Sequence, residues 1–462
     1  MCESGRLFFL SHRAPIVLGH RAAPRRRTRT VGGLARVLED ALEKTGGSWI
    51  ALGAASGPET LAPEYTGLRY PIRNVRLHDA SAFHAGFGNQ VLWPLCHMFP
   101  DRCRFQPAFW AAHRRANEAF AAAVQAVADP RDAVWVDDFH LCLVPGLLRD
   151  AGRCPRIGFF WHIPFPPASL FGICPWREQL LRALLGADVL AFQTDDDARN
   201  FIDCLRHFLG LSPTDDRRRL RLPERDVDVA VLPVGIDAGY LREQAASPIV
   251  RTRAADLRAA LGAEVVILGV DRLDYAKGIP ERLVGFERFL ERHPEWRRRV
   301  SFVQITVPPQ FHLPDEREMK RTIDEMVGRI LGRYTYEGRA PLAYLYTALD
   351  RDRLAAYYLA ADVALVTPLR DGMSLVAKEY VACHTDRDGV LVLSEFAGAA
   401  RELRDALLVN PYDPEAIQTQ LDAALDMPPA ERHRRMQSLS AAVTRHDVEW
   451  WTTNFLQLLA AS

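Results

Sequence analysis

The chain has 462 residues, too many for one hydrophobic core and enough for two domains of about 200 residues each. Hydrophobic residues make up 48% and charged residues 25%, the composition of an ordinary globular protein. Lys+Arg and Asp+Glu both number 58, and the resulting formal net charge of zero argues against a chain-wide electrostatic surface for nucleic acid or for an anionic membrane.

Short apolar runs alternate with helix-length amphipathic runs along the chain. A first series of predicted strands is Leu7–Ser11, Ala133–Val136, Ile157–Trp161, Val189–Phe192 and Val227–Leu232. A second series is Val265–Val270, Val300–Ile305, Asp362–Val366, Val390–Leu393 and Ala406–Val409. Predicted helices include Leu34–Lys44, Trp176–Leu185, Asp196–Leu209, Pro280–Arg292, Asp315–Leu331 and Pro414–Leu425. Apolar strands that are each followed by a helix predict an α/β protein with two doubly wound, Rossmann-like domains and parallel sheets.

The alternation is interrupted once, around Pro233–Tyr240. We place a domain boundary there, with an N-terminal domain over residues 1–236 and a C-terminal domain over 237–446. The last run, Val448–Ala461, has aromatic and leucine residues at helical spacing, so residues 447–462 are predicted to be a helix that packs back on the N-terminal domain. Ligands of such sheets bind at the carboxyl ends of the strands, so two facing domains would form one deep cleft.

The cysteines and the apolar runs predict a cytoplasmic protein. None of the eight cysteines belongs to a C-x-x-C pair, and several lie in apolar runs, as reduced buried thiols do. The run Leu7–Leu10 is too short for a signal peptide, and no run approaches the roughly 18 apolar residues of a membrane span.

Residues 367–380, Thr-Pro-Leu-Arg-Asp-Gly-Met-Ser-Leu-Val-Ala-Lys-Glu-Tyr, are the most informative stretch. A strand, a turn at Gly372 and a helix start leave several backbone N–H groups unpaired, which suits an anionic or polyhydroxylated ligand. Glu379, about two turns into the helix, could accept hydrogen bonds from sugar hydroxyls. The alternative is an ordinary strand-to-helix turn with a solvated glutamate.

Further polar residues follow other predicted strands: Arg13, Gly32 and Gly33, Asp138 and His140, His162, and then Arg272 and Lys277. Each has a structural alternative, such as a helix cap, a core histidine or a cation paired with a nearby carboxylate. Arginine as a planar fork and lysine as a point charge on one loop suit a diphosphate.

Two arginine runs stand out. Arg25, Arg26, Arg27 and Arg29 fall in the loop before Gly32, whereas Arg217, Arg218, Arg219 and Arg221 fall in a predicted surface insertion with a solvated face.

Long, ordered stretches of the chain resemble the trehalose-6-phosphate synthases, which are retaining glycosyltransferases of the two-domain GT-B architecture. The resemblance covers nearly the whole chain. It is carried by residues 11–13, 32–34, 91–94, 135–141, 157–166, 271–278, 367–382 and 390–400.

The resemblance implies a role for each matching residue. The nucleotide-sugar donor would contact Gly32, Gly33, Arg272, Lys277, Leu349, Asp371, Gly372, Met373, Ser374, Leu375, Val376 and Glu379. The acceptor would contact Arg13, His84, Trp93, Asp138 and Gln310. The catalytic set would be His162, Arg272, Lys277 and Asp138.

The implied reaction is front-face transfer of glucose to glucose 6-phosphate with retention of the anomeric configuration. UDP-glucose is the favoured donor. Fixed cations and amides would stabilise the departing diphosphate, so neither a metal nor a cofactor is expected. We interpret Asp195–Asp197 as the start of a helix and Asp137–Asp138 as an acceptor-side element. Uridine, guanosine and adenosine all remain open as the donor base, and self-association is possible.

Departures from the family pattern fall mainly on the acceptor side. His84 replaces a usual tyrosine, Gln310 a usual arginine, Asp137 a histidine, Phe139 a tyrosine, and His12 and Ser374 each an asparagine. Either the Arg25–Arg29 loop, or protonated His84 and His312, compensates for the missing arginine, or the acceptor differs. The alternatives are an enzyme like glucosylglycerol-phosphate synthase, one that uses an unphosphorylated sugar or cyclitol, and a non-catalytic ligand-sensing relative.

Overall fold

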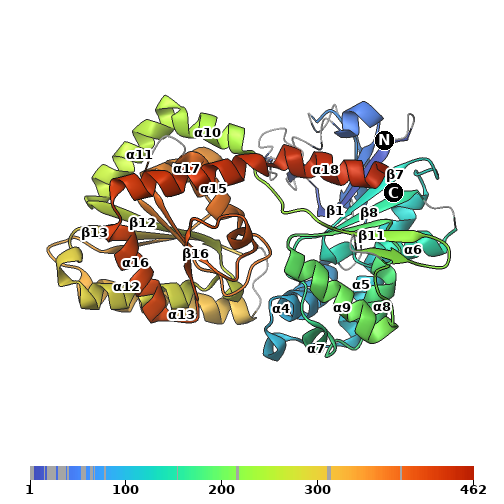
Figure 1. The fold of residues 1–462 in the computed structure, drawn as a ribbon, viewed down its shortest axis with the longest axis horizontal. Coiled ribbons are helices and arrows are strands. Elements are labelled where there is room, and N and C mark those ends of the chain that lie inside the picture. Colours follow the sequence, from blue (N-terminus) through green and yellow to red (C-terminus); the bar gives the residue numbers. More distant parts are fainter. Residues whose placement is uncertain are drawn as a thin grey trace. The chain divides into compact units, whose positions relative to one another are not determined.

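The computed structural model describes residues 5–461 apart from 15, 18–27, 30–37, 39–40, 54–58, 63–65, 67, 78–79, 153–154, 215–217, 310–313 and 385–387. The chain divides into two compact units (Figure 1). The first consists of Met1–Val234 with Val448–Ser462, and the second of Gly235–Asp447.

The first unit is built on a nine-stranded sheet in the order β10-β11-β9-β8-β7-β1-β4-β6-β5. Its strands are β1 (Leu7–Arg13), β4 (Ser48–Leu52), β5 (Thr60–Leu61), β6 (Ile72–Val75), β7 (Ala133–Asp137), β8 (Arg156–Trp161), β9 (Val189–Phe192), β10 (Arg219–Arg221) and β11 (Asp226–Val231). All pairs are parallel except those that β5 and β10 make at the two edges. The chain reverses its direction of winding between the neighbours β1 and β7, and this is the topological switch point of the first unit.

Helices cover this sheet and close its core. They include the π-helix η1 (Phe83–Leu92), α4 (Trp93–Cys96), α5 (Pro107–Gln125), the 3-10 helix η3 (Phe139–Leu141), α6 (Val144–Asp150), α7 (Ala168–Phe171), α8 (Arg177–Leu184) and α9 (Asp195–Leu209). Asp195–Asp197 form the first turn of α9 as predicted, where carboxylates favour the helix dipole, and the Thr194 side chain caps that turn. A separate pair of short strands, β2 (Ile16–Val17) and β3 (Thr28–Arg29), is antiparallel.

The second unit has a six-stranded, fully parallel sheet in the order β14-β13-β12-β15-β16-β17. The strands are β12 (Val265–Arg272), β13 (Val300–Val307), β14 (Leu342–Tyr346), β15 (Val363–Val366), β16 (Val390–Ser394) and β17 (Leu407–Val409). The helices are α10 (Ala238–Ala246), α11 (Pro248–Leu261), α12 (Ile279–Arg292), α13 (Pro314–Tyr334), α14 (Arg351–Ala360), α15 (Leu375–Cys383), α16 (Pro414–Asp426) and α17 (Pro429–Arg445). Here the switch point lies between β12 and β15, and the predicted doubly wound α/β fold is confirmed in both units.

The C-terminal helix α18 (Val448–Ala461) belongs to the first unit, where it contacts β8 and β9 (Figure 1). The Phe455 ring lies 4.2 Å from that of Trp135, and the Trp451 ring lies 4.8 Å from that of Phe160. At Gly158 a Cβ atom would come within 2.8 Å of Phe455, so the glycine permits this close packing. The chain therefore leaves the first unit once and returns to it at its end.

Several elements differ from the prediction. The strands β4, β6 and β14 were not predicted. The strand β6 carries Arg73 and Asn74, and β14 is a half-exposed edge strand. The second arginine run is not purely a solvated insertion. Its residues 219–221 form the edge strand β10, and Arg219 binds Asp228 on β11 with Nε–Oδ1 at 2.8 Å. The predicted helix Leu34–Lys44 lies largely outside the described residues.

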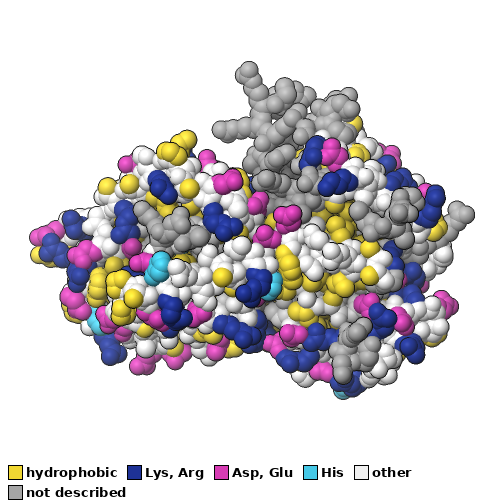
Figure 2. Space-filling view, turned by 45° about the horizontal axis from the view of Figure 1, so that its top comes forward, with side chains coloured by type: hydrophobic (Ala, Val, Ile, Leu, Met, Phe, Trp, Pro, Cys, Tyr) yellow, Lys and Arg dark blue, Asp and Glu magenta, His cyan; other side chains and the backbone are white. Residues whose placement is uncertain are grey.

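The surface agrees with the balanced composition. On the face that Figure 2 shows, basic and acidic side chains are interspersed. None of the helices in the described ranges has the length and hydropathy needed to cross a membrane.

Candidate active site

Two loops meet at the switch point of the second unit, one after β12 and one after β15. After β12 the chain forms a 3-10 turn over Tyr275–Lys277, and Gly278 is the N-cap residue directly before α12. The Leu369 N–H donates to the Ala276 carbonyl at 2.8 Å, and a Cβ on Gly278 would lie 2.3 Å from the Thr367 carbonyl oxygen. Gly278 also has a φ of +63°, so two independent constraints favour glycine here.

This contact brings predicted donor-side residues together. Lys277 Nζ lies 2.7 Å from Asp371 Oδ2, and Ser374 Oγ donates to the same oxygen at 2.6 Å. The Lys277 and Asp371 side chains are only 14% and 15% exposed, whereas Arg272 is 61% exposed with its guanidinium 3.6 Å from Asp274. Both cations thus pair with neighbouring carboxylates, the structural alternative considered above. Asp371 also fixes the position of the lysine ammonium.

A buried arginine stabilises this switch point through several hydrogen bonds. Arg282 on α12 is fully buried, and its Nη1 binds Asp271 at the end of β12. Its Nε donates to Thr367 Oγ1 at 2.9 Å and its Nη1 to Gln304 Oε1 at 3.0 Å. Because the partners come from β12, β13 and the loop after β15, the network holds the ends of three strands in register.

The loop after β15 leads into α15. Ser374 is the residue before the helix and adopts a left-handed conformation with φ of 72°. The Gly398 N–H donates to the Asp371 carbonyl at 3.1 Å, which packs this loop against the next strand's connection. The first N–H groups of α15 have no acceptor within the helix, so residues 372–376 can offer amides to an anion.

Glu379 lies on α15 and is held by a tyrosine. The Tyr358 hydroxyl donates to Glu379 Oε2 at 2.6 Å. Burial raises the pKa of Glu379 above its ordinary value, an effect that the tyrosine bond opposes. With one oxygen fixed, the other can accept from ligand hydroxyls. Leu349, a further predicted donor contact, is half-buried in the segment after β14.

At the switch point of the first unit, Asp138 follows β7 in an unusual conformation. Its φ of 73° and ψ of 162° lie in a region that side chains disfavour. The Asp138 Oδ1 accepts from the N–H groups of Phe139 at 2.9 Å and His162 at 3.2 Å. The second bond connects Asp138 to His162, and both are predicted site residues. Burial raises the pKa of Asp138 to about 6.

The His162 imidazole lies in a chain of polar side chains. Val234 N–H donates to Gln193 Oε1 at 2.9 Å, which leaves the Gln193 amide NH2 facing His162 Nδ1 at 3.2 Å. An amide NH2 only donates, so Nδ1 accepts and Nε2–H donates to Asp137 Oδ1 at 2.9 Å. Gln193 and Asp137 therefore set the tautomer and the orientation of His162.

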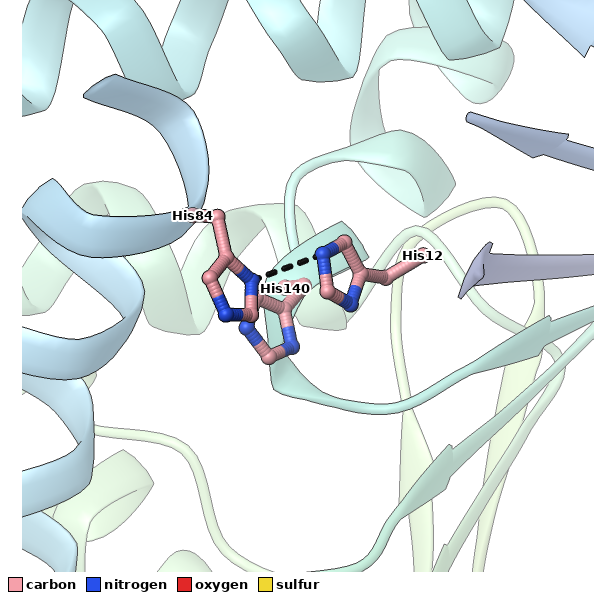
Figure 3. A group of neighbouring side chains, drawn as sticks. All are labelled: His12, His84 and His140. Atoms are coloured by element: carbon pink, nitrogen blue, oxygen red, sulfur yellow. Dashed lines mark hydrogen bonds between the residues drawn. The ribbon is translucent and has the colours of Figure 1, made fainter. Parts of the chain in front are cut away.

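Three histidines gather in one cluster, as Figure 3 shows, and Arg13 contacts one of them. His12 is the next-to-last residue of β1, His84 lies on η1 and His140 lies on η3. Arg13 Nη2 lies 3.3 Å from His84 Nε2, and His84 Nδ1 lies 2.7 Å from His12 Nε2. Because a guanidinium only donates, His84 Nε2 accepts from it and His84 Nδ1–H donates to His12.

The three rings stack, with centroids 4.2 to 5.4 Å apart. Burial lowers the pKa of both His12 and His140, and the neighbouring histidines and Arg13 add to the effect. His12 and His140 are therefore neutral imidazoles at pH 7.

Comparison with known proteins places these two sites in a family. The model of glycosyltransferase family 20 matches residues 8–461. The chain belongs to glycosyltransferase family 20. It is a glycosyltransferase, and the resemblance seen in the sequence is confirmed.

Among its relatives, a trehalose-6-phosphate synthase of Mycolicibacterium smegmatis is 40% identical over 94% of this family-20 chain and 88% of its own length. A bifunctional trehalose-6-phosphate synthase/phosphatase of Thermoproteus tenax is 38% identical over 99% of the chain, which spans 64% of that relative's length.

Two solved structures are similar over 99% of the chain at 34% identity. One is the E. coli protein bound with UDP-2-fluoro glucose, with a TM-score of 0.90 and 99% of its chain covered. The other is a Burkholderia xenovorans synthase in complex with glucose-6-phosphate, with a TM-score of 0.87 and 100% of its chain covered. The interdomain cleft expected of a GT-B enzyme stays a prediction.

For the remaining predicted site residues of this family-20 enzyme, the structure gives less detail. Trp93 begins α4 and its ring lies 4.0 Å from that of His97. Gly32, Gly33, Gln310, His312 and Arg25–Arg27 lie outside the described residues.

Sequence reasoning assigned no role to three polar residues that position side chains of this family-20 site: Gln193, Arg282 and Tyr358. Each acts through another residue rather than from a strand end facing a ligand. Asp137 was interpreted as an acceptor-side element, and its bond to His162 was not foreseen.

Proposed function

We propose that this glycosyltransferase moves glucose from UDP-glucose to glucose 6-phosphate and makes α,α-trehalose 6-phosphate with retention of configuration. The observation that carries the proposal is the contact of Lys277, Asp371 and Ser374 at the β12/β15 switch point, where α/β sheets bind nucleotides. The relatives solved with UDP-2-fluoro glucose and with glucose-6-phosphate support the same donor and acceptor.

In the proposed reaction the second unit binds the donor. Lys277 and the exposed Arg272 bind the diphosphate, and amides of residues 372–376 at the start of α15 accept part of its growing charge. Glu379, positioned by Tyr358, binds the ribose hydroxyls. Leu349 of the same unit, together with Gly32 and Gly33 of the first unit, completes the donor contacts. These groups replace the divalent ion that other transferases use.

The first unit supplies most of the acceptor contacts, which are Arg13, His84, Trp93 and Asp138, and Gln310 of the second unit completes the acceptor set. His162 lies beside the transferred sugar. The acceptor hydroxyl attacks on the face from which the diphosphate leaves, and a leaving-group oxygen takes its proton. Orientation by the fixed Asp138 and His162 supplies much of the remaining rate.

A second acceptor is favoured by one observation. His84, where the family usually has tyrosine, is tied to His12 and Arg13, which leaves a different set of hydrogen-bonding groups in the acceptor set. With Gln310 in place of arginine, the site suits a smaller phosphorylated polyol such as glycerol 3-phosphate, the substrate of a glucosylglycerol-phosphate synthase.

The test is a product assay on the purified enzyme. UDP-, GDP- and ADP-glucose are each offered with glucose 6-phosphate, glycerol 3-phosphate or glucose, and NMR of the product gives the acceptor and the anomeric configuration. We expect UDP-glucose and glucose 6-phosphate to give the highest kcat/KM. Turnover with glycerol 3-phosphate alone would replace our first proposal by the second, and no turnover with any pair would indicate a non-catalytic relative.

The variant Gln310→Arg sharpens this assay. If glucose 6-phosphate is the acceptor, a charge-assisted bond to its phosphate is worth about 1.5–3 kcal/mol, so KM should fall about tenfold or more. A rise in KM for glucose 6-phosphate would instead indicate that Gln310 contacts a different acceptor.

A further inference from the structure

The three-histidine cluster of His12, His84 and His140 has a feature that the proposed transfer does not use. One nitrogen of each imidazole lies within 4.8 Å of one nitrogen of each of the others. The three side chains come from different elements, β1, η1 and η3, and all lie beside the β1/β7 switch point (Figure 3). His84 and His140 are only 6% and 8% exposed.

One nitrogen of this cluster is unsatisfied. His140 Nε2 is buried and has no hydrogen-bond partner among the described residues. A buried imidazole nitrogen without a partner costs free energy, so its retention requires an explanation. Gly88 on η1 leaves room for this ring, because a Cβ atom there would lie only 3.1 Å from Nε2.

We propose that His12, His84 and His140 bind one divalent transition-metal ion, with zinc as the type ion. Neutral imidazoles are good ligands for zinc, cobalt, nickel and copper ions. Zinc–nitrogen bonds of about 2.0–2.1 Å place tetrahedral ligand atoms roughly 3.3 Å apart. The 2.7 Å pair of His84 Nδ1 and His12 Nε2 must open slightly and the third nitrogen must approach. Because the rings stack nearly parallel and their lone pairs lie in the ring planes, the proposal requires the rings to turn toward the ion.

The ion replaces a proton. His84 Nδ1–H now donates to His12, so a metal on Nδ1 moves the ring hydrogen to Nε2, which can then no longer accept from Arg13. Metal binding and the Arg13–His84 contact are therefore mutually exclusive. The Arg13 residue is exposed, so its guanidinium can move to another partner.

Three neutral imidazole ligands leave the ion with its charge of +2 and with a fourth coordination position open. Such a position is typical of sites that bind water or substrate, and a divalent charge next to Arg13 favours an anionic oxygen there. If the proposed function holds, that oxygen belongs to the acceptor phosphate, and the ion supplies the positive charge that Gln310 does not. This proposal departs from the sequence prediction, which expected no metal in the enzyme.

Cobalt binding tests the site independently of catalysis. Co²⁺ is titrated into enzyme that has been treated with a chelator and dialysed, and its visible spectrum reports nitrogen ligation at low coordination number. We expect one equivalent per chain, displaced by Zn²⁺. His84→Tyr and His12→Asn, which restore the residues usual in the family, should each weaken binding at least about tenfold. His207→Asn, an exposed histidine on α9, is the matched control and should leave the titration unchanged.

The proposal is overturned if no single-equivalent spectrum appears, or if both cluster variants bind cobalt like the natural chain. A second arm measures KM for glucose 6-phosphate with and without one equivalent of Zn²⁺, and KM should fall with the ion bound. An unchanged KM overturns the link to the acceptor. A normal cobalt spectrum on a chain that transfers no glucose would overturn the proposed function and leave the metal site standing.

Discussion

The backbone of Asp138 adopts a strained conformation that the surrounding hydrogen bonds maintain. Its φ of 73° and ψ of 162° are ordinarily tolerated by glycine alone, and such strain costs on the order of 1–3 kcal/mol. Its own N–H donates to the Phe160 carbonyl, and its carboxylate accepts from two backbone N–H groups. The carboxylate is thus fixed next to His162, at the expense of stability.

The raised pKa of Asp138 predicts how activity depends on pH. With a pKa of about 6, the carboxylate is mostly protonated at pH 5 and mostly ionised at pH 7, so kcat/KM should rise about tenfold between these values. Asp138→Asn should lower kcat/KM at pH 7 and flatten this limb. The exposed Asp150→Asn is the control and should keep it. A limb that survives in Asp138→Asn would assign it to another group.

The raised pKa of Asp138 also makes the stability of the folded chain depend on pH. The pKa in the folded chain lies above the ordinary value of 3.8, so the folded state is favoured while Asp138 is protonated. That advantage is complete below about pH 4 and is lost as the pH rises through about 6. Asp138→Asn should therefore raise the urea midpoint of the first unit more at pH 8 than at pH 5.

At the scale of elements, the start of α12 decides the position of Lys277. Gly278 and Gly262 both have left-handed φ values, +63° and +60°. Of the two, only Gly278 faces another backbone, because a Cβ atom there would lie 2.3 Å from the Thr367 oxygen. A side chain at Gly278 would separate the loop after β12 from the loop after β15. An alanine at Gly262 therefore tests backbone strain alone, whereas an alanine at Gly278 tests strain together with a steric clash.

Gly278→Ala should destabilise the second unit by at least about 2 kcal/mol and lower turnover steeply, because the Lys277–Asp371 contact depends on the approach. Gly262→Ala should cost about 1 kcal/mol from backbone strain alone and leave turnover intact. Urea unfolding and initial rates measure both effects. Equal losses in the two variants would contradict the proposed importance of the loop contact.

At the scale of the chain, α18 ties the C-terminus to the first unit. Trp451 is fully buried against Trp135 and Phe160, whereas its neighbour Trp450 is half-buried. Along the sequence, residues 235–447 separate the two segments of the first unit, and they form a unit with its own core. The stability of the first unit therefore depends on residues that the chain reaches only after completing the second.

Trp451→Ala should destabilise the first unit by about 3–5 kcal/mol, as loss of a buried aromatic side chain does. Trp450→Ala should cost clearly less. Unfolding followed by hydrogen exchange should show the change in β7 and β8 and leave β12–β17 protected as before. Equal loss of protection in both units would indicate that they unfold together.

Much of the fold follows from patterns that are local in the sequence. Apolar strands such as Val189–Phe192 and Val265–Arg272, each followed by an amphipathic helix, sufficed to predict two parallel α/β domains. They also placed Arg272, Asp371 and Asp138 at strand ends, because strand ends are marked by local turn residues. The strand β6 was missed because Arg73 and Asn74 interrupt its apolar pattern, although Ile72 and Val75 are buried by their neighbours.

Strand order is not a local property, and it brought the site residues together. Parallel pairing of β12 with β15 places Lys277 against Asp371, and pairing of β1 with β7 places His12 against His140. The Asp137–His162–Gln193 chain likewise joins three strands. Such contacts arise from burial of both faces of a sheet, a free energy shared by the whole domain. No short stretch of the sequence encodes them.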